Sequence, residues 1–119
     1  MDYKSVYEDV VKIDPKIRFV TIFDTDGKIA YTGHPEGVRN LLTPDESKRS
    51  LEQAGAIWKL RKELEPKIGK GLYVLAVYEK IKRITMPLDD KHLIYVTTES
   101  DVDHKKLMDS LITLRLSLE

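Results

Sequence analysis

The chain has 119 residues, the usual size of one domain, and no cysteine, which excludes disulfides and thiol chemistry. Twenty basic residues balance twenty acidic ones, and this formal net charge of +0 argues against a protein whose main task is to grip nucleic acid. No apolar run approaches the roughly 18 residues of a membrane span, and the N-terminus lacks the apolar core of a signal peptide. We therefore expect one cytoplasmic domain over residues 1–119.

The first third of the chain predicts a helix and a hairpin. Residues 3–13 place apolar side chains at spacings of three and four, and Asp14-Pro15 ends that helix. Ile17–Asp24 is rich in β-branched and aromatic residues, as a strand requires. The sequence Asp24-Thr25-Asp26-Gly27 is typical of a hairpin turn, and Lys28–Thr32 is the expected returning strand.

A long central helix is predicted from Thr43 to about Glu65. Thr43 is a helix-capping residue, a proline follows it, and Glu46 completes a capping box. Gly55 lies in mid-helix, where it costs about 1 kcal/mol relative to alanine, so we expect another backbone to approach closely there. The apolar residues form two adjoining stripes, which indicates contact with more than the sheet alone: Leu51, Ala54 and Trp58, and beside them Ile57, Leu60 and Leu64.

Three strands and a last helix complete the pattern. Leu72–Tyr78 is apolar on both faces, Lys80–Leu88 turns apolar toward its end, and Leu93–Thr98 forms the third strand. Short connections make these three strands antiparallel neighbours. Ser100, with Asp103 three residues later, opens a helix with leucines at spacings of three and four. The order α-ββ-α-βββ-α predicts an α+β fold with an antiparallel sheet between helical layers.

No stretch of the chain carries a catalytic or ligand-binding signature. Asp24-x-Asp26-Gly27 starts like a calcium loop, but the position of the twelfth ligand is Pro35. His34, His92 and His104 are too scattered to predict a metal site. No Gly-x-Ser-x-Gly turn or phosphate-binding glycine loop is present. We therefore predict no catalytic, metal or cofactor-binding residue and no enzymatic activity.

One segment departs from the neutral charge balance. Residues 59–83 hold eight basic and three acidic side chains, a net charge of +5. A solvated helix end and polar strand face is the simpler interpretation. The alternative is a patch that faces an acidic partner or another anion, with Lys59, Lys62, Lys67 and Lys70 as its candidate residues.

Two stretches carry a family resemblance. IRFVTIFDTDGKIAYTG near the front and the meander YEKIKRITMPLDDKHLIYVTTE, in this order of elements, resemble the roadblock/dynein-light-chain family, a relative of the longin and profilin-like domains. The chain is most similar to the small single-domain archaeal members. The resemblance implies a five-stranded sheet of order 2-1-5-4-3 with helices on both faces. It also implies dimers, regulation of small GTPases or assembly of larger complexes, and no catalysis.

In that strand order Leu72–Tyr78 lies at a sheet edge, although a buried central strand is the alternative. Seven apolar or aromatic residues without a charge would leave an exposed edge open to aggregation. We therefore predict that two copies pair antiparallel through this strand, with their long helices meeting beside the axis. The predicted interface comprises Leu72, Tyr73, Val74, Leu75, Ala76, Val77, Tyr78, Gly55 and Trp58.

These features lead to a functional hypothesis with two alternatives. The leading one is a non-enzymatic regulatory or scaffold module that homodimerises and binds a protein partner such as a small GTPase. The first alternative is a small-molecule sensor, since profilin-like and PAS-like folds share this layout, but bulky residues on the sheet indicate a filled core. The second is a weak anion or nucleic-acid binder that uses residues 59–83.

Overall fold

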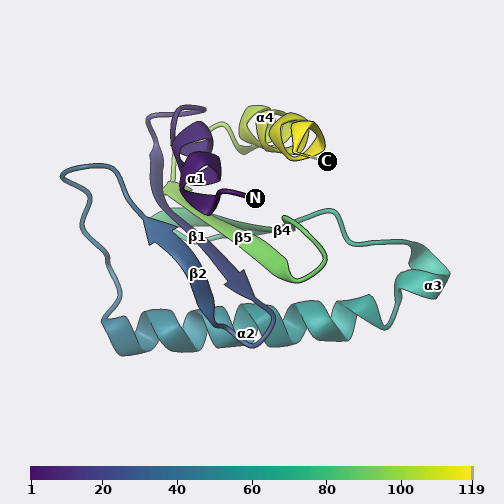
Figure 1. Ribbon diagram of the computed structural model, residues 1–119. Helices are drawn as coiled ribbons and strands as arrows, with labels where there is room; N and C mark the ends of the chain where they lie inside the picture. The colour runs from purple at the N-terminus through teal and green to yellow at the C-terminus, as the bar shows by residue number, and fades with distance from the viewer. Residues whose placement is uncertain (119) are drawn as a thin grey trace.

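The computed structural model describes residues 1–118 and contains four helices and five strands. Five antiparallel strands form one sheet in the order β2-β1-β5-β4-β3. Helices α1 and α4 cover one face of this sheet, and α2 crosses the other (Figure 1). The α+β fold and the strand order are therefore confirmed. The elements are α1 (Tyr3–Val11), β1 (Ile17–Asp24), β2 (Ile29–Gly33), α2 (Pro44–Lys62), α3 (Glu65–Ile68), β3 (Val74–Val77), β4 (Ile81–Pro87), β5 (His92–Glu99) and α4 (His104–Ser117).

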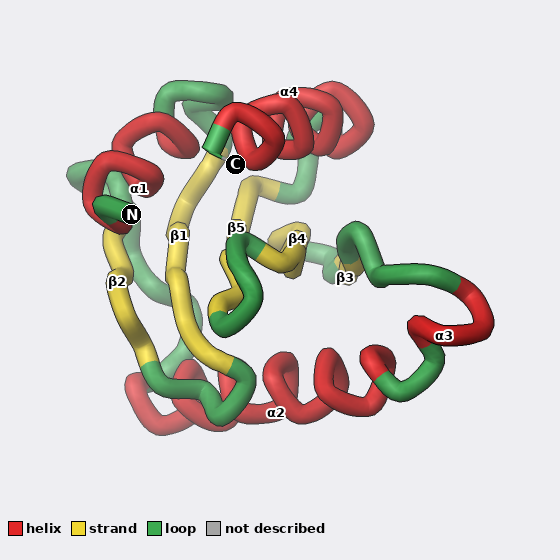
Figure 2. Tube along the Cα trace, turned by 45° about the vertical axis from the view of Figure 1, so that its right-hand side comes forward, coloured by secondary structure: helices red, strands yellow, loops and turns green. Residues whose placement is uncertain are grey.

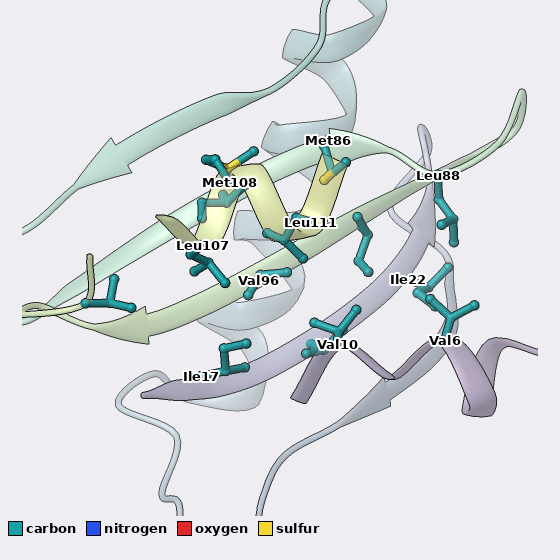
Figure 3. Packing of buried hydrophobic residues seen from close by; sticks show 14 residues of the cluster. Val6, Val10, Ile17, Ile22, Met86, Leu88, Val96, Leu107, Met108 and Leu111 are labelled. Atoms are coloured by element: carbon teal, nitrogen blue, oxygen red, sulfur yellow. The ribbon is translucent and has the colours of Figure 1, made fainter. Parts of the chain in front are cut away.

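The larger core lies between the sheet and the α1/α4 layer. Val6 and Val10 of α1 point onto β1, while α4 places its apolar face over β4 and β5 (Figure 3). Each helix starts at a side-chain cap, Asp2 for α1 and Asp103 for α4. Burial of this apolar surface is what holds the two helices on the sheet. The buried cluster includes Ile17, Ile22, Met86, Val96, Leu107, Met108 and Leu111.

A second, smaller core lies under α2. Thr43 and Glu46 form a complete capping box at the start of this helix. Leu51 and Trp58 pack against Phe23, Leu93 and Tyr95 on the opposite face of the sheet from α1. The other apolar stripe has no cover: Ile57 and Leu60 of α2 and Leu64, just beyond its end, remain 43%, 63% and 52% exposed. One stripe of α2 thus binds the sheet and the other faces solvent.

The β1–β2 turn fixes α2 in place. A Cβ added to Gly55 would lie 2.8 Å from the carbonyl carbon of Thr25, so the turn backbone presses directly on the helix. Gly27 of the turn has φ +88°, and a Cβ added to it would lie 2.8 Å from the side-chain Cγ of Glu52 in α2. Lys59 forms an ion pair with Asp26 of the same turn. The expected close backbone approach at Gly55 is therefore confirmed, and it comes from the chain's own hairpin.

Most predicted boundaries differ from the observed ones by only a few residues, with two larger differences. Helix α2 ends at Lys62 rather than near Glu65, and the short helix α3 was not predicted. Pro66 explains both, since it cannot continue a preceding helix but fits a first helical turn. Strand β3 covers only Val74–Val77, so Leu72 and Tyr73 lie in the loop that leads into it.

Candidate interaction surface

Strand β3 is an edge strand with one unpaired side. It pairs only with β4, from Val74 opposite Thr85 to Val77 opposite Lys82. The alternative of a buried central strand is therefore wrong. The N–H of Tyr78 donates to the carbonyl of Ile81 at 2.9 Å, which sets the alternation of the ladder. The main-chain groups of Leu75 and Val77 consequently point away from β4, toward the free side.

The two side-chain faces of β3 have different neighbours. Val74 packs against the cluster under α2, whereas Leu75 packs against the core beneath α1 and α4. Val77, at the end of the strand, is 62% exposed. The strand contains no charge, proline or bulge, which are the usual protections of an edge. This edge is therefore chemically open to a further strand.

Exposed apolar side chains gather along the stretch of chain around this edge. Eight of the twelve large exposed hydrophobic residues of the described chain fall within residues 57–78, a concentration typical of interaction sites. The stretch runs from the last turns of α2 through α3 and back to β3, and it projects beyond the sheet (Figures 1 and 2). We call this set the edge patch: Ile57, Leu60, Leu64, Ile68, Leu72, Tyr73, Val77 and Tyr78.

The structure separates the predicted interface residues into three groups. Gly55 is buried against Thr25, and Trp58, 4% exposed, fills the core under α2, so both have roles within one copy. Val74, Leu75 and Ala76 are half-buried, while Leu72, Tyr73, Val77 and Tyr78 are exposed. The second apolar stripe of the long helix was expected beside the twofold axis, but its residues were not named among those of the predicted interface. Ile68 was missed because no periodic pattern marks the four-residue helix α3.

The candidate basic residues alternate along the chain with members of the edge patch. Lys59 is engaged with Asp26 of the hairpin turn. Lys62, Lys67 and Lys70 are exposed and form no ion pair with any residue in 1–118. Their positive charge therefore lies beside an apolar surface and faces solvent.

A hollow of about 170 Å³ lies between α2 and the strands β3, β4 and β5. Apolar, aromatic and polar side chains line it, and its two charged lining residues are both arginines, Arg61 of α2 and Arg83 of β4. The Cζ atom of Arg83 lies 5.3 Å from the ring centroid of Tyr78 and 5.5 Å from that of Tyr95. These distances are within the range of cation–π attraction. The hollow is smaller than the 300–1,000 Å³ typical of small-molecule sites.

The residues weighed as metal ligands lie apart. His34 contacts the carbonyl of Pro35, His92 contacts Asp89, and His104 contacts Lys82. Within residues 1–118 no three His, Asp or Glu side chains are placed to hold one metal ion. Asp24 accepts hydrogen bonds from the N–H groups of Asp26 and Lys28, so it closes the hairpin turn as predicted. No described helix combines the length and the apolarity that crossing a bilayer requires.

Solved structures of low sequence identity share this architecture. No protein-family model matches the chain, and no curated protein matches its sequence. The Roadblock/LC7 domain of Streptomyces avermitilis superposes with a TM-score of 0.71 at 14% identity, covering 93% of this chain and 89% of that one. An MglB protein with a tetrameric arrangement gives 0.78 at 9% identity, with 97% and 83% covered. Profilin IA of Acanthamoeba castellanii gives 0.61 at 12% identity, with 98% and 96% covered. The chain therefore has the fold of the roadblock/LC7 domains, which profilin shares.

Proposed function

We propose that this chain is a non-enzymatic regulatory or scaffold module of the roadblock kind, which homodimerises and then binds a protein partner. The observation that carries the proposal is the open edge of β3 beside the edge patch. In a monomer, an unprotected edge with this much exposed apolar surface promotes aggregation. In an assembly, the same surface is buried and stabilises the contact. The tetrameric arrangement of an MglB structure of the same fold supports an assembling module.

In the proposed dimer two β3 strands run antiparallel across a twofold axis. The outward N–H and C=O groups of Leu75 and Val77 supply the ladder in each copy. The two five-stranded sheets would then form one continuous sheet. Leu60 near the end of α2 and Leu64 just beyond it would meet their counterparts and lose their exposure, whereas Ile57, which lines the hollow, stays open to a further partner. Every substitution in such a contact acts twice, because both copies use the same surface.

The family resemblance suggests which partner the dimer recruits. It points to a small GTPase, and this class of partner is part of the proposal. A small GTPase of the source organism, loaded in turn with GDP and with a non-hydrolysable GTP analogue, should bind the wild-type dimer in calorimetry. A monomeric variant should bind more weakly, because the proposed recruiting surface spans both copies. If the dimeric wild type and the monomeric variant bind the GTPase with equal affinity, the partner site does not depend on the dimer and this part of the proposal is refuted.

The dimer is tested at Val77, whose side chain is exposed and whose N–H faces the free edge. Val77→Lys adds a charge to the seam, the proposed contact between the β3 strands of two copies. Val77→Pro removes an N–H donor that faces the free edge and leaves the hydrogen bonds to β4 intact. We expect light scattering at about 50 μM, a concentration at which micromolar affinities are visible, to give twice the 13.7 kDa chain mass for the wild type. Both variants should shift toward 13.7 kDa.

The matched control is Ile29→Lys on β2, the opposite edge of the sheet. Ile29 is 49% exposed, so the substitution changes a comparable position far from the seam. This variant should remain dimeric. Circular dichroism should show that all three variants are folded. A monomeric wild type, or folded Val77 variants that stay dimeric, would refute pairing through β3.

A further inference from the structure

We propose that the hollow between α2 and the sheet is a carboxylate-binding pocket, in which Arg83 receives an acidic side chain from a protein partner. All of its lining residues belong to one copy, so the pocket itself does not depend on the dimer. The protein nature of the occupant does rest on the proposed function.

Two aromatic rings hold the guanidinium of Arg83. Its guanidinium lies against the rings of Tyr78 and Tyr95, at 5.3 and 5.5 Å from their centroids. A guanidinium attracted to aromatic rings keeps its N–H donors, and two of them fit the two oxygens of a carboxylate. The aromatic rings also restrict the side chain in advance, so less conformational entropy is lost when a ligand binds. Arg83 is therefore preorganised for a planar anion.

Arg83 has no counter-ion among the described residues. Within residues 1–118 its guanidinium forms no ion pair and donates no hydrogen bond, and its Nε atom is buried and unpaired. Arg18 of β1 shows the contrast, because it donates to Glu99 at 2.8 Å and to the carbonyl of Arg39 at 2.6 Å. Since only Nε of Arg83 is covered, its terminal amino groups are the part that a ligand can reach.

The composition and size of the hollow favour one acidic side chain as its occupant. None of its lining residues is acidic, and Arg61 of α2 adds a second positive charge. Ser50, Gln53 and Thr85 add polar groups beside the apolar wall formed with Trp58. Two arginines without a counter-ion attract an anion. A volume of about 170 Å³ is small for a free ligand but adequate for one side chain.

The surroundings favour a side chain that belongs to a protein. Ile57 and Tyr78 line the hollow and are also exposed members of the edge patch. A partner segment that lies against Ile57 and Tyr78 can therefore place a glutamate in the hollow at the same time. Such a buried charge pair inside an apolar contact supplies specificity, because a partner without the acid leaves Arg83 unsatisfied.

Nuclear magnetic resonance tests the pocket directly on the full chain. The probe is the capped tripeptide acetyl-Ala-Glu-Ala-amide, titrated while the Nε–Hε signals of the arginines are followed. We expect a saturable shift of the Arg83 signal. Arg115 is the internal control, since its Nε is also buried and unpaired but does not line the hollow, so its signal should not move. The glutamine version of the peptide should have no effect.

Variants provide the second readout through Trp58, the only tryptophan, which lines the hollow. The Glu peptide should change its fluorescence in the wild type and in Arg49→Gln, a matched control on the exposed side of α2. Arg83→Gln should abolish the change. Arg83→Lys keeps the positive charge but loses the paired N–H donors of the guanidinium. Its affinity for the Glu peptide should be lower by at least about fivefold. Folding of each variant is checked by circular dichroism.

Three results would overturn the inference. The first is an Arg83→Gln protein that is folded and binds the Glu peptide as the wild type does. The second is an equal response to succinate at the same concentration, which would assign the hollow to free small acids. The third is peptide binding that appears only in the Val77→Lys variant, which would mean that the second copy already fills the hollow. A monomeric wild type that still binds the peptide through Arg83 would refute the dimer and leave the pocket standing.

Discussion

Replacing Gly55 by alanine tests whether the β1–β2 turn positions α2. The added Cβ would lie 2.8 Å from the carbonyl carbon of Thr25, closer than real Cβ atoms come, and at a tight 3.1 Å from its Cα. The obstacle is backbone rather than the end of a flexible side chain, so α2 or the turn must move. That movement would also strain the ion pair between Lys59 and Asp26.

The expected magnitude is the difference between two effects. Alanine in a helix interior gains about 1 kcal/mol over glycine. Overpacking costs about 1–3 kcal/mol, and a backbone clash belongs at the upper end. The net loss in the free energy of unfolding should therefore be about 2 kcal/mol. For a chain of this length that corresponds to a melting temperature about 8 °C lower.

Urea titration followed by circular dichroism measures this loss, and two controls isolate its cause. Ala56→Gly, at the exposed neighbouring position, should cost about 1 kcal/mol through helix propensity alone. Gly71→Ala should change stability by less than about 0.5 kcal/mol, because its Cβ would sit at an ordinary 3.5 Å from Trp58. A Gly55→Ala protein that equals or exceeds the wild type in stability would refute the reasoning.

Two further predictions concern the β4–β5 turn, where Asp89 contacts Tyr3 of α1, and the core under α2 on the opposite face of the sheet. The pKa of Asp89 lies below its ordinary value, because burial raises it but hydrogen bonds from the N–H of Lys91 and from His92 lower it by more. A carboxyl with a depressed folded-state pKa contributes stability above its unfolded pKa, near 3.9, that is lost as the pH falls through the folded value. Urea titrations between about pH 3 and 6 should therefore show a shallower decline in Asp89→Asn than in the wild type, and identical slopes would contradict this. On the other face, Trp58→Ala should lower the free energy of unfolding by about 3–5 kcal/mol in urea titrations, and a loss below about 1 kcal/mol would mean that the core under α2 is loosely packed.

The elements of the fold could be predicted from local chemistry, but their neighbours could not. The capping box at Thr43 and the turn at Asp24 are short-range signals, and both are present as predicted. Periodicity identifies a strand without saying which strand lies beside it. The order β2-β1-β5-β4-β3 therefore came only with the family resemblance. The end of the long helix was predicted near Glu65, but Pro66 also lies in the first turn of the short helix α3, which has no periodic pattern.

The candidate surface could be predicted only in part, because some of its features are local in the sequence and others depend on contacts between distant elements. The absence of charge in Leu72–Tyr78 and the second stripe of α2 are both visible in the sequence, and they indicate surface that the sheet does not cover. The hollow around Arg83 could not be foreseen. Tyr78 and Tyr95 lie far apart in sequence, and only the pairing of β3 and β5 with β4 brings both rings to the arginine.

The two edges of the sheet show why α2 and β3 should be considered together. On the β2 edge the only large exposed hydrophobic residue is Ile29, and Gly33 is covered by the ring of Tyr7. On the β3 edge the open ladder, the uncovered stripe of α2 and the hollow with Arg83 all lie on one stretch of surface. The last turns of α2 reach past β3 on this side (Figure 2). A helix that served only the core of one copy would not need a second apolar stripe or the turns that extend beyond β3. This arrangement supports the proposals that a neighbouring protein chain covers the edge patch and that an acidic side chain of a partner enters the hollow.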